Sequence, residues 1–437
     1  MRKILIGLLV LAMVASVVVG FLAYLPQVNP KNQDPFADVP YPSIQSFRFA
    51  DLAGQDVTGA DLSEVTEPGT LTFDSATKWP AEDKMPEDFS PNVLLKNARY
   101  LGLGLRGLHD QGITGKGISV AVIDRPMLKD HEEFGDNIEY IEVLPGDANQ
   151  AAVNFHGTAI TGILAGKNGV APGAHVYYYA IPNDDNAYAT SAQAMDKIIE
   201  LNKTLPAGEK IRIVAAAQSA NPLDEAANVG GAKDWSDAIK RAQDAGIIVL
   251  YAGMPELDFT GAGAVPGKDR DDPQNYRPWT WTTAKAWVVQ KLKDAGASSW
   301  ESARKELIRL LTEQPDLDSL QAEALNTYIY LTESYKQTST FDAWFAVAPG
   351  VQVSEALAIP VDCITIANVD GADTYTYYGS GGLSWATPYI AGLMALGLQV
   401  EPSAVPVDLF KALNDTGTPF ATGGKLVNPA GFIQALK

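Results

Sequence analysis

The segment ISVAVID at residues 118–124 is an uninterrupted apolar run that ends in an aspartate. Runs of this length, rich in β-branched residues, are typical of strands that are buried on both faces of a sheet. Comparable runs lie at 175–181, 211–217, 246–252 and 361–368, separated by segments with the apolar spacing of helices. This alternation predicts an α/β fold built on a doubly wound, mostly parallel sheet.

The alternation of strands and helices stops between about residues 255 and 345. A stretch rich in Pro, Gly and Asp at 255–279 predicts a loop. Helical patterns follow near 282–294, 299–313 and 318–336. We therefore expect a domain over residues 96–437 that carries a helical insertion at about 255–345.

Composition limits the classes of function. The chain has 437 residues, of which 46% are hydrophobic, which is enough for one large globular domain. Its net charge is −19 and it has no cluster of Lys and Arg, so we expect no nucleic-acid partner. The single cysteine, Cys363, excludes an internal disulfide. We assign no metal and no other cofactor, since the acidic cluster at 269–272 is interrupted by Arg270 and is typical of a solvated loop.

The N-terminal residues predict a membrane segment. Basic residues at positions 2 and 3 precede an uncharged apolar run from Ile4 to Leu25. About 20 apolar residues span a bilayer, whereas the core of a signal peptide has about 7–15. We expect a signal-anchor over 1–25 that contacts the membrane through residues 4–25, with the remaining chain outside the cytoplasm. The protein would then be a single-pass protein of the cell membrane, or a secreted one if the segment is cleaved.

Residues 26–95 predict a tether followed by an irregular segment. The part up to about residue 45 is rich in Pro, Asn, Gln and Asp. Three similar units, ADLAG, QDVTG and ADLSE, then follow one another over 50–64. They resemble pentapeptide repeats, but three units make less than one coil of a repeat fold. We favour a short irregular edge segment.

The segment GGLSWATPYIAGLMALGLQV at 381–400 predicts a buried helix that begins near Ser384. It is apolar nearly all round, and Pro388 is tolerated only because it lies in the first turns. Ser384 therefore lies where free N–H groups and the positive end of the helix dipole stabilise an oxyanion. The same position also suits an ordinary N-cap serine. Position alone leaves both interpretations open.

The order of residues along the chain distinguishes a nucleophilic serine from an ordinary N-cap serine. The chain has four histidines, which are His109, His131, His156 and His175. His156 directly precedes a helical pattern of small residues, and Asp124 ends a predicted strand, where functional groups gather in open α/β sheets. A nucleophilic serine needs a base and a carboxylate that orients the base. No histidine follows Ser384, which excludes the serine-first order of α/β-hydrolases and leaves the order Asp, His, Ser.

Three blocks in this order are GKGISVAVID (115–124), HGTAITGILAGKNGVAPGAHV (156–176) and GGLSWATPYIAG (381–392). They resemble the aspartate, histidine and serine blocks of the subtilisin-like serine peptidases, in a variant found in membrane-associated proteins of Gram-positive bacteria. The resemblance implies a sheet of subtilisin type and a peptide or protein substrate. It also implies that Asp124, His156 and Ser384 are the catalytic residues.

The resemblance further implies the residues around the reacting bond. The asparagine that completes the family's oxyanion hole corresponds to Met254, whose thioether donates no hydrogen bond. Loss of one such donor typically lowers turnover about 10²–10³-fold. The backbone N–H of Ser384 remains as an oxyanion donor. The wall of the substrate cleft corresponds to Ser219, Ala220 and Asn221.

Two functions are therefore compatible with the sequence. The first is a serine endopeptidase that hydrolyses extracytoplasmic proteins, with reduced activity because of Met254. The alternative is a degenerate peptidase that binds peptides or proteins without cutting them. Retention of all three residues implied as catalytic favours the enzyme.

Overall fold

The computed structural model describes residues 49–437, apart from 148–151, 184–186, 219–224, 226–227, 253, 315–316, 336–339, 346–355 and 421–423. The signal-anchor predicted at 1–25 and the tether predicted up to residue 45 lie outside this part of the chain.

A parallel five-stranded sheet lies at the centre of the fold, with strand order β3-β4-β2-β5-β6. Its strands are β2 (Ser119–Asp124), β3 (Ile138–Glu142), β4 (His175–Ala180), β5 (Ile211–Ala215) and β6 (Ile248–Leu250). Both faces of the sheet are covered, because Val120 and Val122 belong to one hydrophobic core whereas Ala121 and Ile123 belong to another. The doubly wound parallel sheet predicted from the sequence is thus confirmed.

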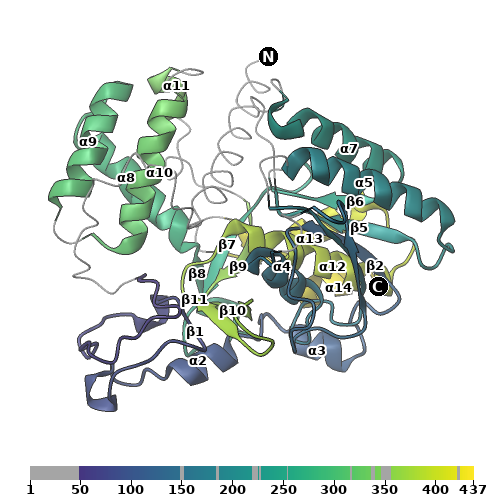
Figure 1. The fold of residues 1–437 in the computed structure, drawn as a ribbon, viewed down its shortest axis with the longest axis horizontal. Coiled ribbons are helices and arrows are strands. Elements are labelled where there is room, and N and C mark those ends of the chain that lie inside the picture. The colour runs from purple at the N-terminus through teal and green to yellow at the C-terminus, as the bar shows by residue number, and fades with distance from the viewer. Residues whose placement is uncertain are drawn as a thin grey trace.

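Helices cover the two faces of this sheet (Figure 1). The helices α4 (Phe155–Ala165) and α12 (Ala386–Val400) pack on the face of Val120, and α5 (Ala187–Thr204) and α7 (Ala232–Asp244) pack on the other. Within the described part of the chain, only the stretch 383–400 is long and apolar enough to cross a membrane, and 89% of it is buried inside the protein. The apolar character of α12 therefore follows from its place in the core.

A second sheet extends the fold, in the order β12-β13-β9-β7-β8. Its strands are β7 (Phe259–Ala264), β8 (Tyr276–Pro278), β9 (Leu357–Asp362), β12 (Thr418–Pro419) and β13 (Lys425–Leu426). The inner strands β7, β9 and β13 run parallel, and the outer strands are antiparallel to them. The prediction of a loop at 255–279 is wrong, because this stretch contains β7 and β8. Its glycines have a packing role, since a Cβ on Gly261 would lie 2.6 Å from the Trp279 ring.

A third, antiparallel sheet pairs β1 (Phe73–Asp74), β11 (Tyr375–Tyr378) and β10 (Ile364–Ala367). The sequence predicts one strand over 361–368, whereas the structure divides this run between β9 and β10. The division falls at Cys363, whose φ of 55° is left-handed and interrupts the extended backbone.

The three five-residue units at 50–64 form a regular ladder rather than the irregular segment expected. The backbone N–H groups of Leu52, Val57 and Leu62 each donate to a carbonyl of the segment 72–84, at distances of 2.8–2.9 Å. The aspartate of each unit accepts the N–H of the residue two positions later. The repeat is therefore stabilised by an adjoining chain segment, which supplies the stacking partner that three units alone lack.

The helical insertion consists of α8 (Thr280–Asp294), α9 (Trp300–Glu313), α10 (Ser319–Tyr335) and α11 (Phe341–Phe345). The first three agree with the predicted helices. They form a group on the side of the molecule away from α5 and α7 (Figure 1). The remaining short helices are α2 (Pro91–Asn97), α3 (Leu105–Asp110), α13 (Pro406–Thr416), α14 (Pro429–Ala435), and the 3₁₀ turns η1 (Pro68–Thr70), η2 (Glu82–Lys84), η4 (Val229–Gly231), η5 (Pro273–Asn275) and η6 (Leu383–Trp385).

Candidate active site

Asp124 is the last residue of β2, at the carboxyl edge of the central sheet. Its side chain is buried, with 6% of the residue exposed. The carboxylate atom Oδ1 accepts the backbone N–H of Arg125 at 2.7 Å. A buried carboxylate needs such donors because burial removes its water shell. Asp124 is thus held at the edge where parallel sheets gather functional groups.

His156 is held at the start of α4 by local contacts. The Asn154 side chain caps the helix and accepts the backbone N–H of His156 at 2.8 Å. Gly157 lets the first turn lie against the chain that follows Asp124, since a Cβ there would lie 2.3 Å from the carbonyl oxygen of Arg125. The first turn of α4 therefore packs directly against the segment that follows β2.

Asp124 and His156 are in direct contact. Both carboxylate oxygens of Asp124 lie 2.9 Å from Nδ1 of His156. This contact places the imidazole proton on Nδ1, so Nε2 carries the free lone pair. Nε2 is buried and has no hydrogen-bond partner among the described residues. The pair therefore offers an oriented base whose active nitrogen is unoccupied.

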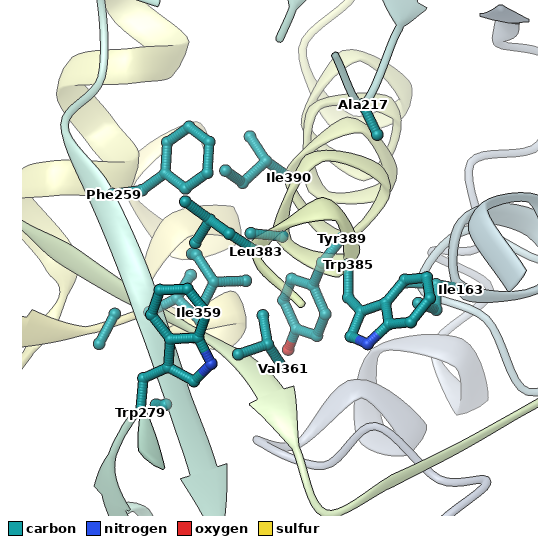
Figure 2. Packing of buried hydrophobic residues seen from close by; sticks show 14 of the residues in the cluster. Ile163, Ala217, Phe259, Trp279, Ile359, Val361, Leu383, Trp385, Tyr389 and Ile390 are labelled. Atoms are coloured by element: carbon teal, nitrogen blue, oxygen red, sulfur yellow. The ribbon is translucent and has the colours of Figure 1, made fainter. Parts of the chain in front are cut away.

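Ser384 lies in η6, immediately before α12. It is also buried, with 8% of the residue exposed. The next residue, Trp385, packs on the catalytic candidate His156, with ring centroids 5.8 Å apart. Figure 2 shows Leu383 and Trp385 at the start of the helix that continues to Tyr389 and Ile390. The structure thus brings the turn that contains Ser384 against α4.

The structure describes Met254 and the backbone of Ser384, which were predicted to lie around the reacting bond. Met254 follows β6 and belongs to the main hydrophobic core, with 4% of the residue exposed. Its side chain offers no donor for an oxyanion. The backbone N–H of Ser384 lies at a helix start, where N–H groups have no partner within the helix. The predicted cleft residues 219–221 lie outside the described part of the chain.

The acidic cluster at 269–272 takes part in structural contacts. The carboxylate of Asp271 accepts the hydroxyl of Tyr100 and the backbone N–H of Gly104. The carboxylate of Asp272 caps η5 by accepting the N–H of Gln274. Across the positions that the structure describes, no group of three or more His, Cys, Asp or Glu side chains could hold a metal ion.

Two residues that contact the candidate site, Asn154 and Trp279, were not singled out from the sequence. Asn154 carries a signal that could have been found, because an asparagine before a predicted helix is a preferred cap. Trp279 carries no such signal. Its indole, drawn in Figure 2, belongs to the buried core. It donates a hydrogen bond of 2.8 Å to the carbonyl of Gly381, a contact across more than one hundred residues that only the tertiary fold creates.

The chain is similar to several known proteins. A subtilisin-like protease of Coccidioides posadasii is 24% identical over 296 residues, which are 66% of this chain and 46% of that protein. The chain thus spans about half the length of this curated relative. Among solved structures, the prenylagaramide maturation protease PagA shares 16% identity over 76% of this chain and 98% of its own, with a TM-score of 0.43. Fervidolysin from Fervidobacterium pennivorans, described as a keratinolytic enzyme related to subtilisin, shares 16% identity over 77% of this chain and 45% of its own, also with a TM-score of 0.43.

A family model provides the assignment. The model of the subtilase family matches residues 115–431, which is well over half of the chain and includes Asp124, His156 and Ser384. The chain therefore belongs to the subtilase family.

Proposed function

We propose that the protein is a serine endopeptidase in which Asp124 orients His156 and His156 activates Ser384. The observation that carries the proposal is the contact of both Asp124 oxygens with His156 Nδ1, which leaves the buried Nε2 free beside the turn of Ser384. A serine hydroxyl becomes an effective nucleophile when an adjacent base takes its proton. Family membership supports a peptide or protein substrate.

The proposed reaction has two halves. In the first, Oγ of Ser384 attacks the peptide carbonyl carbon while its proton moves to Nε2 of His156. The charge of Asp124 stabilises the imidazolium that forms. When the carbon–nitrogen bond breaks, Nε2 returns the proton to the leaving amine. In the second half, Nε2 takes a proton from water, water attacks the acyl-serine ester, and Ser384 regains its hydrogen.

The oxyanion of each tetrahedral intermediate would be stabilised by the backbone N–H of Ser384. The start of α12 supports this role, because the helix dipole is positive there. Met254 adds no donor, so we propose an enzyme of reduced turnover. Residues 219–221 would form part of the substrate cleft, as the family resemblance implies.

We also propose where the enzyme acts. The apolar run from Ile4 to Leu25, preceded by two basic residues, supports a signal-anchor that places the peptidase domain outside the cytoplasm. Its substrates would then be extracytoplasmic proteins. Retention of the full-length protein in membranes after a high-salt wash would support the anchor, whereas release would show that the segment is cleaved.

One observation favours a second function. The buried thioether of Met254 stands where the family has a hydrogen-bond donor, which suits a protein that binds peptides without cutting them. Hydrolysis of an unfolded substrate such as casein separates the two functions. The peptidase should release fragments that disappear in Ser384→Ala and in His156→Ala. A folded wild-type protein that binds casein and releases none would support the binding function.

A further inference from the structure

We propose that Asp362 is a positioning residue for Ser384, and that it couples the helical insertion to the loop before the nucleophile. The inference rests on the proposed peptidase function. Asp362 is the last residue of β9 and is fully buried, with 0% exposed. It is a carboxylate at the end of an otherwise apolar strand, and the triad mechanism does not use it.

The first contact of Asp362 is with the loop before the nucleophile. Its Oδ1 accepts the backbone N–H of Gly381 at 2.8 Å. Gly381 lies three residues before Ser384, and a Cβ on it would lie 1.9 Å from the carbonyl oxygen of Val361. The loop therefore packs directly against the end of β9, and the carboxylate holds it there through the N–H of Gly381.

The second contact is with the start of the helical insertion. Oδ2 of Asp362 accepts the backbone N–H of Thr280, the first residue of α8, at 2.8 Å. Two further bonds join the same segments, because Trp279 donates to the Gly381 carbonyl at 2.8 Å and the Thr280 hydroxyl donates to the Ser380 hydroxyl at 2.9 Å. One carboxylate thus lies between the insertion and the loop and accepts a backbone N–H from each.

The ionised form of Asp362 suits this arrangement. An ionised carboxylate accepts hydrogen bonds on both oxygens, whereas a protonated acid or an asparagine has one strong acceptor oxygen. Loss of the charge would leave either Gly381 or Thr280 with a buried N–H that lacks a good partner, which is costly. The loop would relax, and Ser384 would move away from its productive position. Small misplacements of catalytic groups lower rates by up to about 10²-fold.

The surroundings of Asp362 make its charge sensitive to pH. Burial raises the pKa of Asp362 to about 6. The two backbone N–H bonds, the Thr280 side chain and the Arg277 guanidinium of β8 partly oppose this shift. The next residue, Cys363, carries the neighbouring ionisable group, a buried thiol whose pKa burial also raises. The carboxylate is therefore present above about pH 6 and is lost as the pH falls through that value.

The test is the rate of fluorophosphonate labelling of wild type and Asp362→Asn between pH 5 and 8. We expect Asp362→Asn to react about tenfold to hundredfold more slowly at pH 8. The two rates should converge near pH 5, because wild type itself is then protonated at this position. Asp318→Asn is the control, since it removes a buried carboxylate at the start of α10 and should keep the wild-type rate.

A second pair of variants tests the link to the insertion and does not depend on the folding of Asp362→Asn. Thr280→Pro removes the N–H that donates to Oδ2 at a helix position where proline is favoured, and the extended backbone of Trp279 (ψ 126°) is compatible with a following proline. Thr280→Val removes the hydroxyl but keeps that N–H. We expect Thr280→Pro to label at least several-fold more slowly than Thr280→Val.

The outcomes separate this inference from the proposed function. A folded wild-type protein that does not react at Ser384 would contradict the peptidase itself. A reactive wild type whose rate is matched by Asp362→Asn at pH 8, or a constant rate ratio between pH 5 and 8, would overturn the role of Asp362. Equal rates in Thr280→Pro and Thr280→Val would overturn the coupling to the insertion.

Discussion

Both carboxylate oxygens of Asp124 lie 2.9 Å from Nδ1 of His156, although the two residues are 32 positions apart in the chain. Asp124 ends a strand and His156 begins a helix, so each side chain is anchored by regular structure on one side. The contact fixes both the tautomer and the orientation of the imidazole. The proposed reaction depends on this relationship.

Asp124→Asn should lower kcat about 10⁴-fold with little change in fold. The amide of asparagine would donate to Nδ1, which places the imidazole proton on Nε2 and removes the base. Steady-state hydrolysis of a peptide ester measures the effect, and circular dichroism checks the fold. Activity within tenfold of wild type would show that Asp124 does not orient His156 in this way.

Met254→Asn should raise kcat by at least tenfold and leave KM nearly unchanged. The new carboxamide would add a second donor for the oxyanion, and such donors contribute up to about 10²–10³ in turnover. Met254→Leu is the matched control, because it keeps the volume and adds no donor. Equal activity of the two variants would mean that position 254 does not face the oxyanion.

Gly381→Ala should slow labelling of Ser384 by at least tenfold and destabilise the protein by about 1–3 kcal/mol. The added Cβ would lie 1.9 Å from the Val361 carbonyl oxygen and 2.8 Å from the Trp385 ring, so the loop must shift. Gly107→Ala is the control, since a Cβ there meets nothing within 4 Å in the middle of α3. Gly107→Ala should label at the wild-type rate. If it labels as slowly as Gly381→Ala, the slower labelling does not come from displacement of the loop before Ser384.

Lys285→Met should raise Tm by about 2–4 °C at pH 7. Lys285 is buried in α8, near the rings of Trp279 and Trp281, and burial lowers its pKa well below the usual value. The charge of Glu323 opposes this shift only in part, so the unfolded chain binds the proton more tightly than the folded chain does. This cost of folding fades as the pH rises toward the unfolded pKa of about 10.4. The gain in Tm should accordingly shrink between pH 7 and 10.

The control for this substitution is Lys293→Met, which changes an exposed lysine of the same helix and should shift Tm little. A fall in Tm for Lys285→Met at pH 7 would show that the buried amine stabilises the insertion.

The parts of the fold predicted correctly from the sequence have local signals. The strand of Asp124 is continuously apolar because both of its faces are covered, and the helix after Ser384 is apolar because it lies in the core. By contrast, β7 consists of FTGAGA, whose glycines are typical of loops by composition. They are needed because Trp279 and Asp362 approach the backbone closely, and no local pattern reveals that approach.

In the candidate site, too, some residues have a local sequence signal and others depend on the tertiary fold. Chain order and element ends identified Asp124, His156 and Ser384 as candidates, since each lies at a recognisable boundary. Asp362 was part of a predicted strand, but its two partners, Thr280 and Gly381, lie 82 and 19 positions away. Hydrogen bonds between backbone groups and a distant carboxylate depend on the tertiary fold, so the sequence offered only an unexplained charge in an apolar run.

The most direct test of the proposed triad is the intact mass of the folded protein after reaction with a fluorophosphonate at pH 8. We expect one adduct per chain, located on Ser384 by peptide mapping and absent from both Ser384→Ala and His156→Ala. A folded wild-type protein with no adduct, or an adduct that persists when His156 is replaced, would contradict it.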